Sequence, residues 1–218
     1  TSGQCYATVN WTEPTAIDNC SSSGNLVWTK SHLPNSNFAI GNTPITYTVA
    51  DESGNISNAC SFTVTVTESE VPTAVCKNAN IYLNSSGQAT LGVSDINNNS
   101  SDNCTAGNNL IFTLSKTNFN CTNSGNNNVV LTVRDIAGNQ NTCIANVTVS
   151  DTIKPVITAT LGTATSNVNT AIGQCYYVVN GSEFDPVYND NCSGTVLSYT
   201  VSGATTLSGT GSLAGKQL

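Results

Sequence analysis

Apolar and polar residues alternate with a period of two along most of this chain. The clearest segments are 45–49, 62–66, 129–133 and 145–149, where Val, Ile, Leu or an aromatic residue alternates mainly with Thr. This period places successive side chains on opposite faces of a strand, and Val and Thr both favour that environment. No window combines a helical period with capping residues. The pattern therefore predicts an all-β fold.

The same passage occurs more than once along the chain. The segment from Thr46 to Val66 returns between Leu131 and Val149, and the tripeptide Asp-Asn-Cys begins at Asp18, Asp102 and Asp190. The first two copies are 102 − 18 = 84 residues apart. A fixed period of this length indicates an array of one repeated structural unit.

Prolines indicate where each repeat begins. Pro72 and Pro155 each open an extended segment after a terminal strand. We therefore predict a first repeat at 1–70 without its first strand, a complete second repeat at 71–153, and a third at 154–218 without its closing hairpin. Short strands with turn signals every 8–12 residues favour immunoglobulin-like β-sandwiches. The short linkers predict that neighbouring repeats stack end to end as a semi-rigid rod.

Two candidate hairpin turns share the same sequence pattern. Asp51 to Asn55 and Asp135 to Asn139 each open on Asp and close on Gly-Asn. Such turns need one residue at positive φ, which Gly adopts without strain. The sequence predicts a tight hairpin at both places.

Nine cysteines recur at equivalent positions in successive repeats. A recurring set of this density indicates a disulfide framework formed in an oxidising compartment. Metal sites or reduced core thiols are the alternative, but there is no Cys-x-x-Cys pair and only one histidine.

A comparison of repeats suggests which cysteines pair. The Gly-Gln-Cys of residues 3–5 becomes Gly-Gln-Ala at Ala89, and the second repeat gains Cys121. We interpret the loss and the gain as one compensated event inside a repeat, with each short loop contributing about 3 kcal/mol. The predicted disulfides are Cys5–Cys20, Cys76–Cys143, Cys104–Cys121 and Cys175–Cys192, with Cys60 unpaired in this fragment.

Composition excludes several classes of function. Only 9% of residues are charged, the net charge is −7, and the six basic residues are scattered singly. This leaves no cationic surface for nucleic acid. No apolar run reaches the 18 or so residues that a membrane-spanning helix needs. His32 has no counterpart in the other repeats and no Gly-x-Ser-x-Gly motif occurs, so we predict that the chain is not an enzyme.

Calcium is the one cofactor with a physical argument. In a sandwich of this type, the linker, the Asp-Asn-Cys loop and the hairpin meet at one end. That arrangement predicts two groups of acidic residues at the repeat boundaries: Glu68, Glu70, Asp102 and Asp135, and Asp151, Asp185 and Asp190. Converging carboxylates suit Ca²⁺. The alternative is that these residues cap turns and remain solvated.

The first repeat resembles a known family. The segment Gly3 to Trp11 (GQCYATVNW), the following Asp-Asn-Cys and the segment Phe38 to Val66 are similar to the HYR (hyalin repeat) module. The resemblance implies immunoglobulin-like modules that serve in extracellular adhesion.

The second repeat resembles the tandem repeats of SprB-type gliding-motility adhesins of the Bacteroidota. That resemblance implies an extracellular, cell-surface protein associated with the outer membrane and served by export or motility machinery. Asp151-Thr152-Ile153 is similar to the short O-glycosylation signal of these bacteria, which makes Thr152 a candidate for glycosylation.

These observations lead to one main hypothesis on function. The chain is a non-enzymatic repeat stalk of a large surface adhesin involved in adhesion and gliding motility. Weak contacts with polysaccharide or solid surfaces would be strengthened by the number of repeats. The alternatives are accessory modules of a large secreted hydrolase, and a carbohydrate-binding module with a defined pocket.

Overall fold

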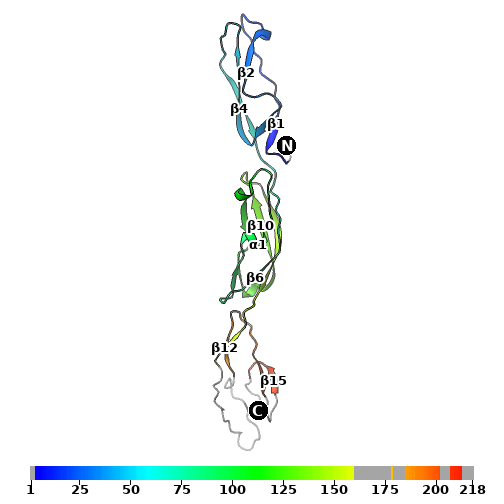
Figure 1. Cartoon of the computed structure of the whole chain (residues 1–218), viewed down its shortest axis with the longest axis vertical. Coiled ribbons are helices and arrows are strands. Elements are labelled where there is room, and N and C mark those ends of the chain that lie inside the picture. The colour runs from blue at the N-terminus through cyan, green and yellow to red at the C-terminus, as the bar shows by residue number, and fades with distance from the viewer. Residues whose placement is uncertain (1–2, 160–177, 179–184, 202–206, 213–218) are drawn as a thin grey trace, which may run out of the picture. The chain divides into compact units, whose positions relative to one another are not determined.

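The computed structural model describes residues 3–159, 178, 185–201 and 207–212 (Figure 1). Its secondary structure is almost entirely β, as the hydrophobic period predicts. The strands are β1 (Tyr6–Val9), β2 (Val27–Lys30), β3 (Ser36–Ala39), β4 (Gly41–Ala50), β5 (Cys60–Val66), β6 (Ala79–Tyr82), β7 (Gln88–Thr90), β8 (Ile111–Leu114), β9 (Asn118–Asn120), β10 (Gly125–Arg134), β11 (Gln140–Ser150), β12 (Val156–Ala159), β13 (Val187–Asn189), β14 (Ser198–Val201) and β15 (Leu207–Thr210). The helical elements in these residues are single turns: α1 (Val93–Ile96), η1 (Ser23–Asn25), η2 (Gly107–Asn109) and η3 (Cys121–Asn123).

Internal contacts divide the chain into two compact units. Unit 1 comprises 1–77, 96–115 and 130–144, and unit 2 comprises 78–95, 116–129 and 145–218. These units do not coincide with the three repeats of the sequence. The terms first, second and third repeat are kept below for residues 1–70, 71–153 and 154–218.

The first repeat, in unit 1, is a two-sheet sandwich. Strands β1 and β3 form one antiparallel sheet, and β2, β4 and β5 form the other in the order β2-β4-β5. The buried cluster between them contains Phe38, Ile45, Tyr47, Val64 and Val66, packed against Ala7, Val9, Trp11 and Trp28. Tyr47 is buried, and its hydroxyl accepts a hydrogen bond of 2.6 Å from the Trp11 indole. This partner removes the cost of burying the phenol oxygen.

The second repeat has the same alternation of buried and exposed positions. In unit 1 the strand order is β11-β10-β8, and in unit 2 it is β6-β11-β10, with β6 parallel to β11. The second-repeat positions predicted to face a core are at most 1% exposed: Val129, Leu131, Val133, Ala145, Val147 and Val149. Strands β7 and β9 form a separate antiparallel pair in unit 2. The same unit holds the antiparallel pairs β12–β13 and β14–β15 of the third repeat.

Both predicted hairpin turns are present and use glycine as expected. Gly54 has φ +84° and Gly138 has φ +101°. In each turn the amide of the first residue donates to the carbonyl of the last, from Asp51 to Asn55 and from Asp135 to Asn139, both at 3.0 Å. The repeated sequence thus builds the same turn twice.

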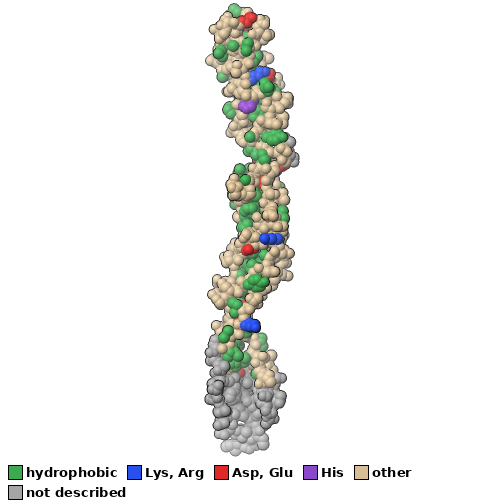
Figure 2. All heavy atoms as spheres, viewed as in Figure 1, with side chains coloured by type: hydrophobic (Ala, Val, Ile, Leu, Met, Phe, Trp, Pro, Cys, Tyr) green, Lys and Arg blue, Asp and Glu red, His purple; other side chains and the backbone are tan. Residues whose placement is uncertain are grey.

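The surface matches the composition. Blue and red side chains are few in the space-filling view (Figure 2). One ion pair, Lys30–Glu13 at 2.8 Å, is found among the described residues.

His32 lies beside Ser31 and against the ring of Phe38, 5.2 Å between centroids. None of the described helices has the length and apolar character that crossing a bilayer requires.

Candidate functional site

The boundary between the first and second repeats is closed by a disulfide within unit 1. Cys5, just before β1, is bonded to Cys104 with 5.2 Å between their Cα atoms. Cys104 is held by the Asp-Asn-Cys loop, because one oxygen of Asp102 accepts from the amides of Cys104 (2.9 Å) and Thr105 (2.7 Å). The aspartate therefore acts as a turn cap that orients the cysteine.

Glu70 of the linker ties the same boundary together by hydrogen bonds. The amide of Gly3 donates to both of its carboxylate oxygens, at 2.8 and 2.9 Å. The Asn103 side chain donates to Oε2 at 2.9 Å. One carboxylate thus contacts the start of the first repeat and the Asp-Asn-Cys loop of the second.

Glu68 covers the hairpin of the second repeat. The Asn139 side chain donates to Glu68 Oε2 at 2.7 Å and to Asp135 Oδ2 at 2.8 Å. Asp135 Oδ1 accepts from the amides of Gly138 (2.6 Å) and Asn139 (2.8 Å). Asp135 is only 1% exposed, although it is ionisable.

The two carboxyl groups of this pair are shifted in opposite directions. Burial, together with the adjacent Asp135, raises the pKa of Glu68. Burial would also raise the pKa of Asp135, but hydrogen bonds from Asn139, Glu68 and Gly138 outweigh it and lower the pKa. Between the two pKa values Glu68 is protonated and Asp135 is ionised, so the pair shares one proton.

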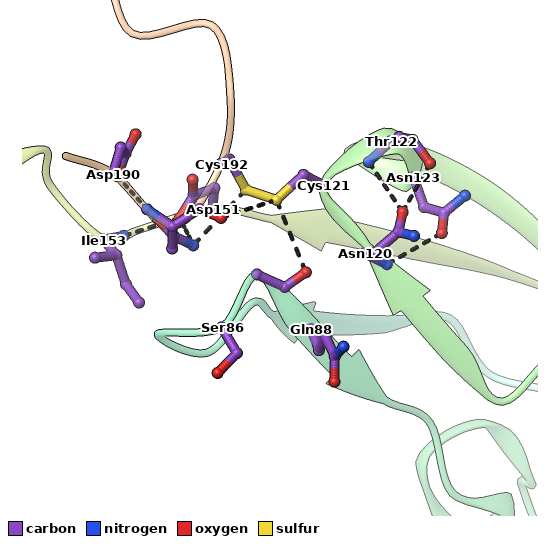
Figure 3. The surroundings of a disulfide bond; sticks show 12 residues. Ser86, Gln88, Asn120, Cys121, Thr122, Asn123, Asp151, Ile153, Asp190 and Cys192 are labelled. Carbon is purple, nitrogen blue, oxygen red and sulfur yellow. Dashed lines mark hydrogen bonds between the residues drawn. A yellow bond between two sulfur atoms is a disulfide. The ribbon is translucent and has the colours of Figure 1, made fainter.

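The boundary between the second and third repeats, in unit 2, repeats the first with different residues. Cys121 is bonded to Cys192, with 5.5 Å between Cα atoms (Figure 3). Cys121 begins η3, which Asn120 caps by accepting from the Thr122 amide at 3.0 Å. The side-chain amide of Asn191 donates to Asp151 Oδ1 (3.0 Å) and to the Asn84 carbonyl (3.2 Å). At this boundary Asn191 makes the hydrogen bonds between repeats that Glu70 makes at the first boundary.

The cysteine pairs differ from the prediction in one systematic way. The structure joins Cys76 to Cys143, as predicted, and leaves Cys60 without a disulfide. The predicted pairs Cys5–Cys20, Cys104–Cys121 and Cys175–Cys192 are wrong, because Cys104 and Cys192 each bond a cysteine of the preceding repeat. Cys20 is left as a free, exposed thiol. Cys175 lies outside the described residues.

The loss of a cysteine at Ala89 and the gain of Cys121 have a geometric basis, although the predicted partner of Cys121, Cys104, was wrong. Ala89 pairs with Phe119 across β7 and β9, two residues from Cys121. The Cys121 sulfur lies 3.8 Å from the carbonyl of Gly87. Cys121 therefore occupies, from the neighbouring strand, the end of the repeat where the Gly-Gln-Cys cysteine would lie. Sequence comparison located that position but could not show that it faces the next repeat.

The corrected pairs close much longer loops than predicted. The sequence separations are 99 residues for Cys5–Cys104 and 71 residues for Cys121–Cys192, whereas the loop of 67 residues closed by Cys76–Cys143 is as predicted. On the chain-entropy scale such loops correspond to about 4–5 kcal/mol each, against about 3 kcal/mol for a 15-residue loop.

The acidic residues predicted to bind calcium are in part brought together. Glu68 meets Asp135, and Glu70 meets the loop of Asp102. Most of their oxygens accept hydrogen bonds from N–H groups, which favours the turn-capping alternative. Asp102 Oδ1 is buried without a hydrogen-bond partner, as is Asn191 Oδ1 at the second boundary. Within the described ranges, no three Asp, Glu, His or Cys side chains form a group able to hold a metal ion.

In the second predicted calcium group the contact runs through an asparagine. Asp190 accepts from the Asn191 amide at 2.9 Å, and Asp151 accepts from the side chain of the same residue. Asp185 is partly buried, and its part in a calcium site stays a prediction. Thr152 is exposed beside Asp151, and its glycosylation stays a prediction.

Sequence reasoning missed the asparagines of these boundaries. Asn103, Asn139 and Asn191 make the contacts that close them. The signal was present, since an asparagine follows the aspartate in each Asp-Asn-Cys tripeptide and the glycine in each hairpin. In a chain so rich in asparagine, that recurrence did not stand out.

Comparison with known proteins supports the first resemblance. The family model for the HYR domain matches residues 1–66. Hyalin of Strongylocentrotus purpuratus is 46% identical over 70 residues, which are 31% of this chain and 6% of that protein. Hyalin of Lytechinus variegatus is 32% identical over 203 residues, which are 89% of this chain and 36% of that protein.

The chain therefore spans well under two thirds of either relative. Human mucin-like protocadherin EC1-2 aligns with 66% of this chain and 92% of its own, at 12% identity and a TM-score of 0.34, which carries no argument about fold. These sea urchin relatives give no support to the resemblance to SprB-type adhesins.

Proposed function

We propose that this chain is a non-enzymatic, adhesion-type stretch of an extracellular protein, in which consecutive HYR-like repeats are covalently joined end to end. The observation that carries the proposal is the pair of disulfides at successive boundaries, Cys5–Cys104 and Cys121–Cys192. Structural disulfides are typical of proteins in oxidising compartments. The similarity to hyalin over 89% of the chain supports the same class.

The proposed mechanism is mechanical. Tension along the chain would pass through the linkers, where one disulfide and several charge-assisted hydrogen bonds bridge neighbouring repeats. Polar side chains on the surface would make weak contacts with polysaccharide or solid surfaces, and the number of repeats would supply avidity. Gliding motility and association with an outer membrane have no support among the relatives above and form no part of the proposal. No observation on the described residues favours an accessory role in a hydrolase.

Adhesion of beads under flow tests this proposal. Beads coated with the full chain should be retained on polysaccharide-coated or bare surfaces more strongly than albumin-coated beads. The double variant Cys121→Ser/Cys192→Ser should be retained less at high shear but equally at low shear, because it weakens the boundary and not the surface. Retention equal to that of albumin at every shear rate would contradict the proposal.

A further inference from the structure

The first repeat displays a second copy of the surface that the second repeat uses at its boundary. Asp18 caps its loop as Asp102 does, accepting at one oxygen from the amides of Cys20 (2.7 Å) and Ser21 (3.2 Å). The hydroxyl that follows each cysteine is buried and accepts from the hairpin: Ser21 from the Glu52 amide, and Thr105 from the Ile136 amide. The two loops are therefore built alike.

The hairpins beside these loops are also built alike. Asn55 donates to Asp51 through its amide (2.8 Å) and through its side chain (2.7 Å). Asn139 makes the same two bonds to Asp135, both at 2.8 Å. The whole surface is thus preformed in the first repeat.

The two surfaces differ in the residues that cover them. In the second repeat the surface is contacted by Cys5, by Glu70 and by Glu68. In the first repeat Cys20 is a free, exposed thiol, and Asn55 is exposed. Cys60, which is equivalent to Cys143, is also free and exposed, whereas Cys143 is bonded to Cys76 of the first segment of its repeat.

We infer that the Cys20 end of the first repeat is a docking surface for another repeat of the same kind, joined in tandem. The partner contributes a cysteine at the position of Cys5 to bond Cys20, an acidic linker to cover the Asp51 hairpin, and a cysteine at the position of Cys76 to bond Cys60. Each bond forms when two thiols and one oxidised glutathione give a protein disulfide and two reduced glutathiones. The inference rests on the covalent joining of repeats in the proposed function, and not on adhesion.

The chain itself supplies a probe at the correct spacing. Asn84 precedes Ser85-Ser86-Gly87, and Thr1-Ser2-Gly3 is the equivalent of that tripeptide. A fusion of residues 1–84 to the start of the full 1–218 chain therefore continues the repeat without a break. It provides an added Cys5, an acidic linker and an added Cys76 in front of the first repeat.

Peptide mapping of this fusion, refolded in a glutathione redox buffer and alkylated, tests the inference. In the unfused chain Cys20 should be alkylated fully. In the fusion its alkylation should fall at least tenfold, and a disulfide to the added Cys5 should appear. A fusion whose added copy carries Cys5→Ser should restore the alkylation.

The tryptic peptide that carries Cys20 begins at residue 78 of the added copy, so its mass separates it from the added Cys20. Full alkylation of Cys20 in a fusion that retains the Cys5–Cys104 bond would overturn the inference. Disulfide-linked dimers of the unfused chain through Cys20 would overturn the tandem arrangement.

Discussion

The hairpin ends of the first and second repeats have nearly the same residues and quite different environments. Asp51 and Asp135 accept the same bonds from the asparagine that closes each turn. Asp51 is half-buried, whereas Asp135 is 1% exposed beneath Glu68. The turn is thus a local property of the sequence. The burial, the shifted pKa of Glu68 and the disulfide arise only where another repeat is attached.

Removing the disulfide at the covered end should have the largest effect. While the second repeat stays folded, an unfolded first repeat is a loop closed at one end by Cys5–Cys104. The double variant Cys5→Ser/Cys104→Ser should therefore lower the free energy of unfolding of the first repeat by about 4 kcal/mol. Urea denaturation followed by tryptophan fluorescence measures this change, since Trp11 and Trp28 are both in that repeat's core.

Cys20→Ser is the matched control for this variant. It changes the equivalent cysteine at the uncovered end, which makes no disulfide. The control should alter the stability by less than about 0.5 kcal/mol. An equal loss in both variants would contradict the difference between the two ends.

Removing the hairpin aspartate should lower the stability more at the covered end than at the uncovered end. Asp135→Ala leaves partly buried donors of Gly138 and Asn139 without an acceptor, which costs about 2–3 kcal/mol. Asp51→Ala removes the acceptor of the exposed Asn55 donors, which water can replace, and should cost less than about 1 kcal/mol. Differential scanning calorimetry of the two variants measures both effects. Similar losses would show that the covering linker contributes nothing.

The pH dependence should sharpen the comparison further. The raised pKa of Glu68 contributes stability at low pH that is lost as the pH rises through that pKa. The lowered pKa of Asp135 contributes stability that is lost as the pH falls through it. Stability from the pair is therefore greatest between the two pKa values and falls towards neutral pH.

Glu68→Gln removes the charge that appears as the pH rises. This variant should melt a few degrees higher than the unmodified chain near pH 7, with little difference near pH 4. Glu52→Gln, next to Asp51 at the uncovered end, is the matched control for the substitution itself. Thermal melts at the two pH values would contradict the shared proton if Glu68→Gln were destabilising at pH 7.

Calcium should have the smallest effect. The oxygens of Glu68, Glu70 and Asp135 already accept hydrogen bonds from protein N–H groups, which Ca²⁺ would have to displace. At about 1 mM Ca²⁺, the affinity range of extracellular modules, the melting temperature should move by less than about 1 °C. A rise of several degrees that a chelator reverses and Asp102→Asn abolishes would instead establish the predicted calcium site.

Much of the fold could be predicted because it is local. The alternation at 129–133 and 145–149 located buried strands, and Gly54 and Gly138 located the turns. The disulfide partners were less accessible, since Cys104 is closer in sequence to Cys121 than to Cys5. Short loops are entropically favoured in a single module. Only the three-dimensional structure shows that Cys5 and Cys121 lie at an end of one repeat that meets the next.

Disulfide mapping of the unmodified full chain tests the central claim most directly. Trypsin cleaves after Lys30, Lys77, Lys116 and Arg134, which places Cys5 and Cys20 in one peptide and Cys104 and Cys121 in two others. Without reduction, mass spectrometry should find 1–30 linked to 78–116, and 117–134 linked to the peptide that carries Cys192. An unlinked 1–30 peptide with an internal Cys5–Cys20 bond, together with 78–116 linked to 117–134, would contradict covalent joining of consecutive repeats.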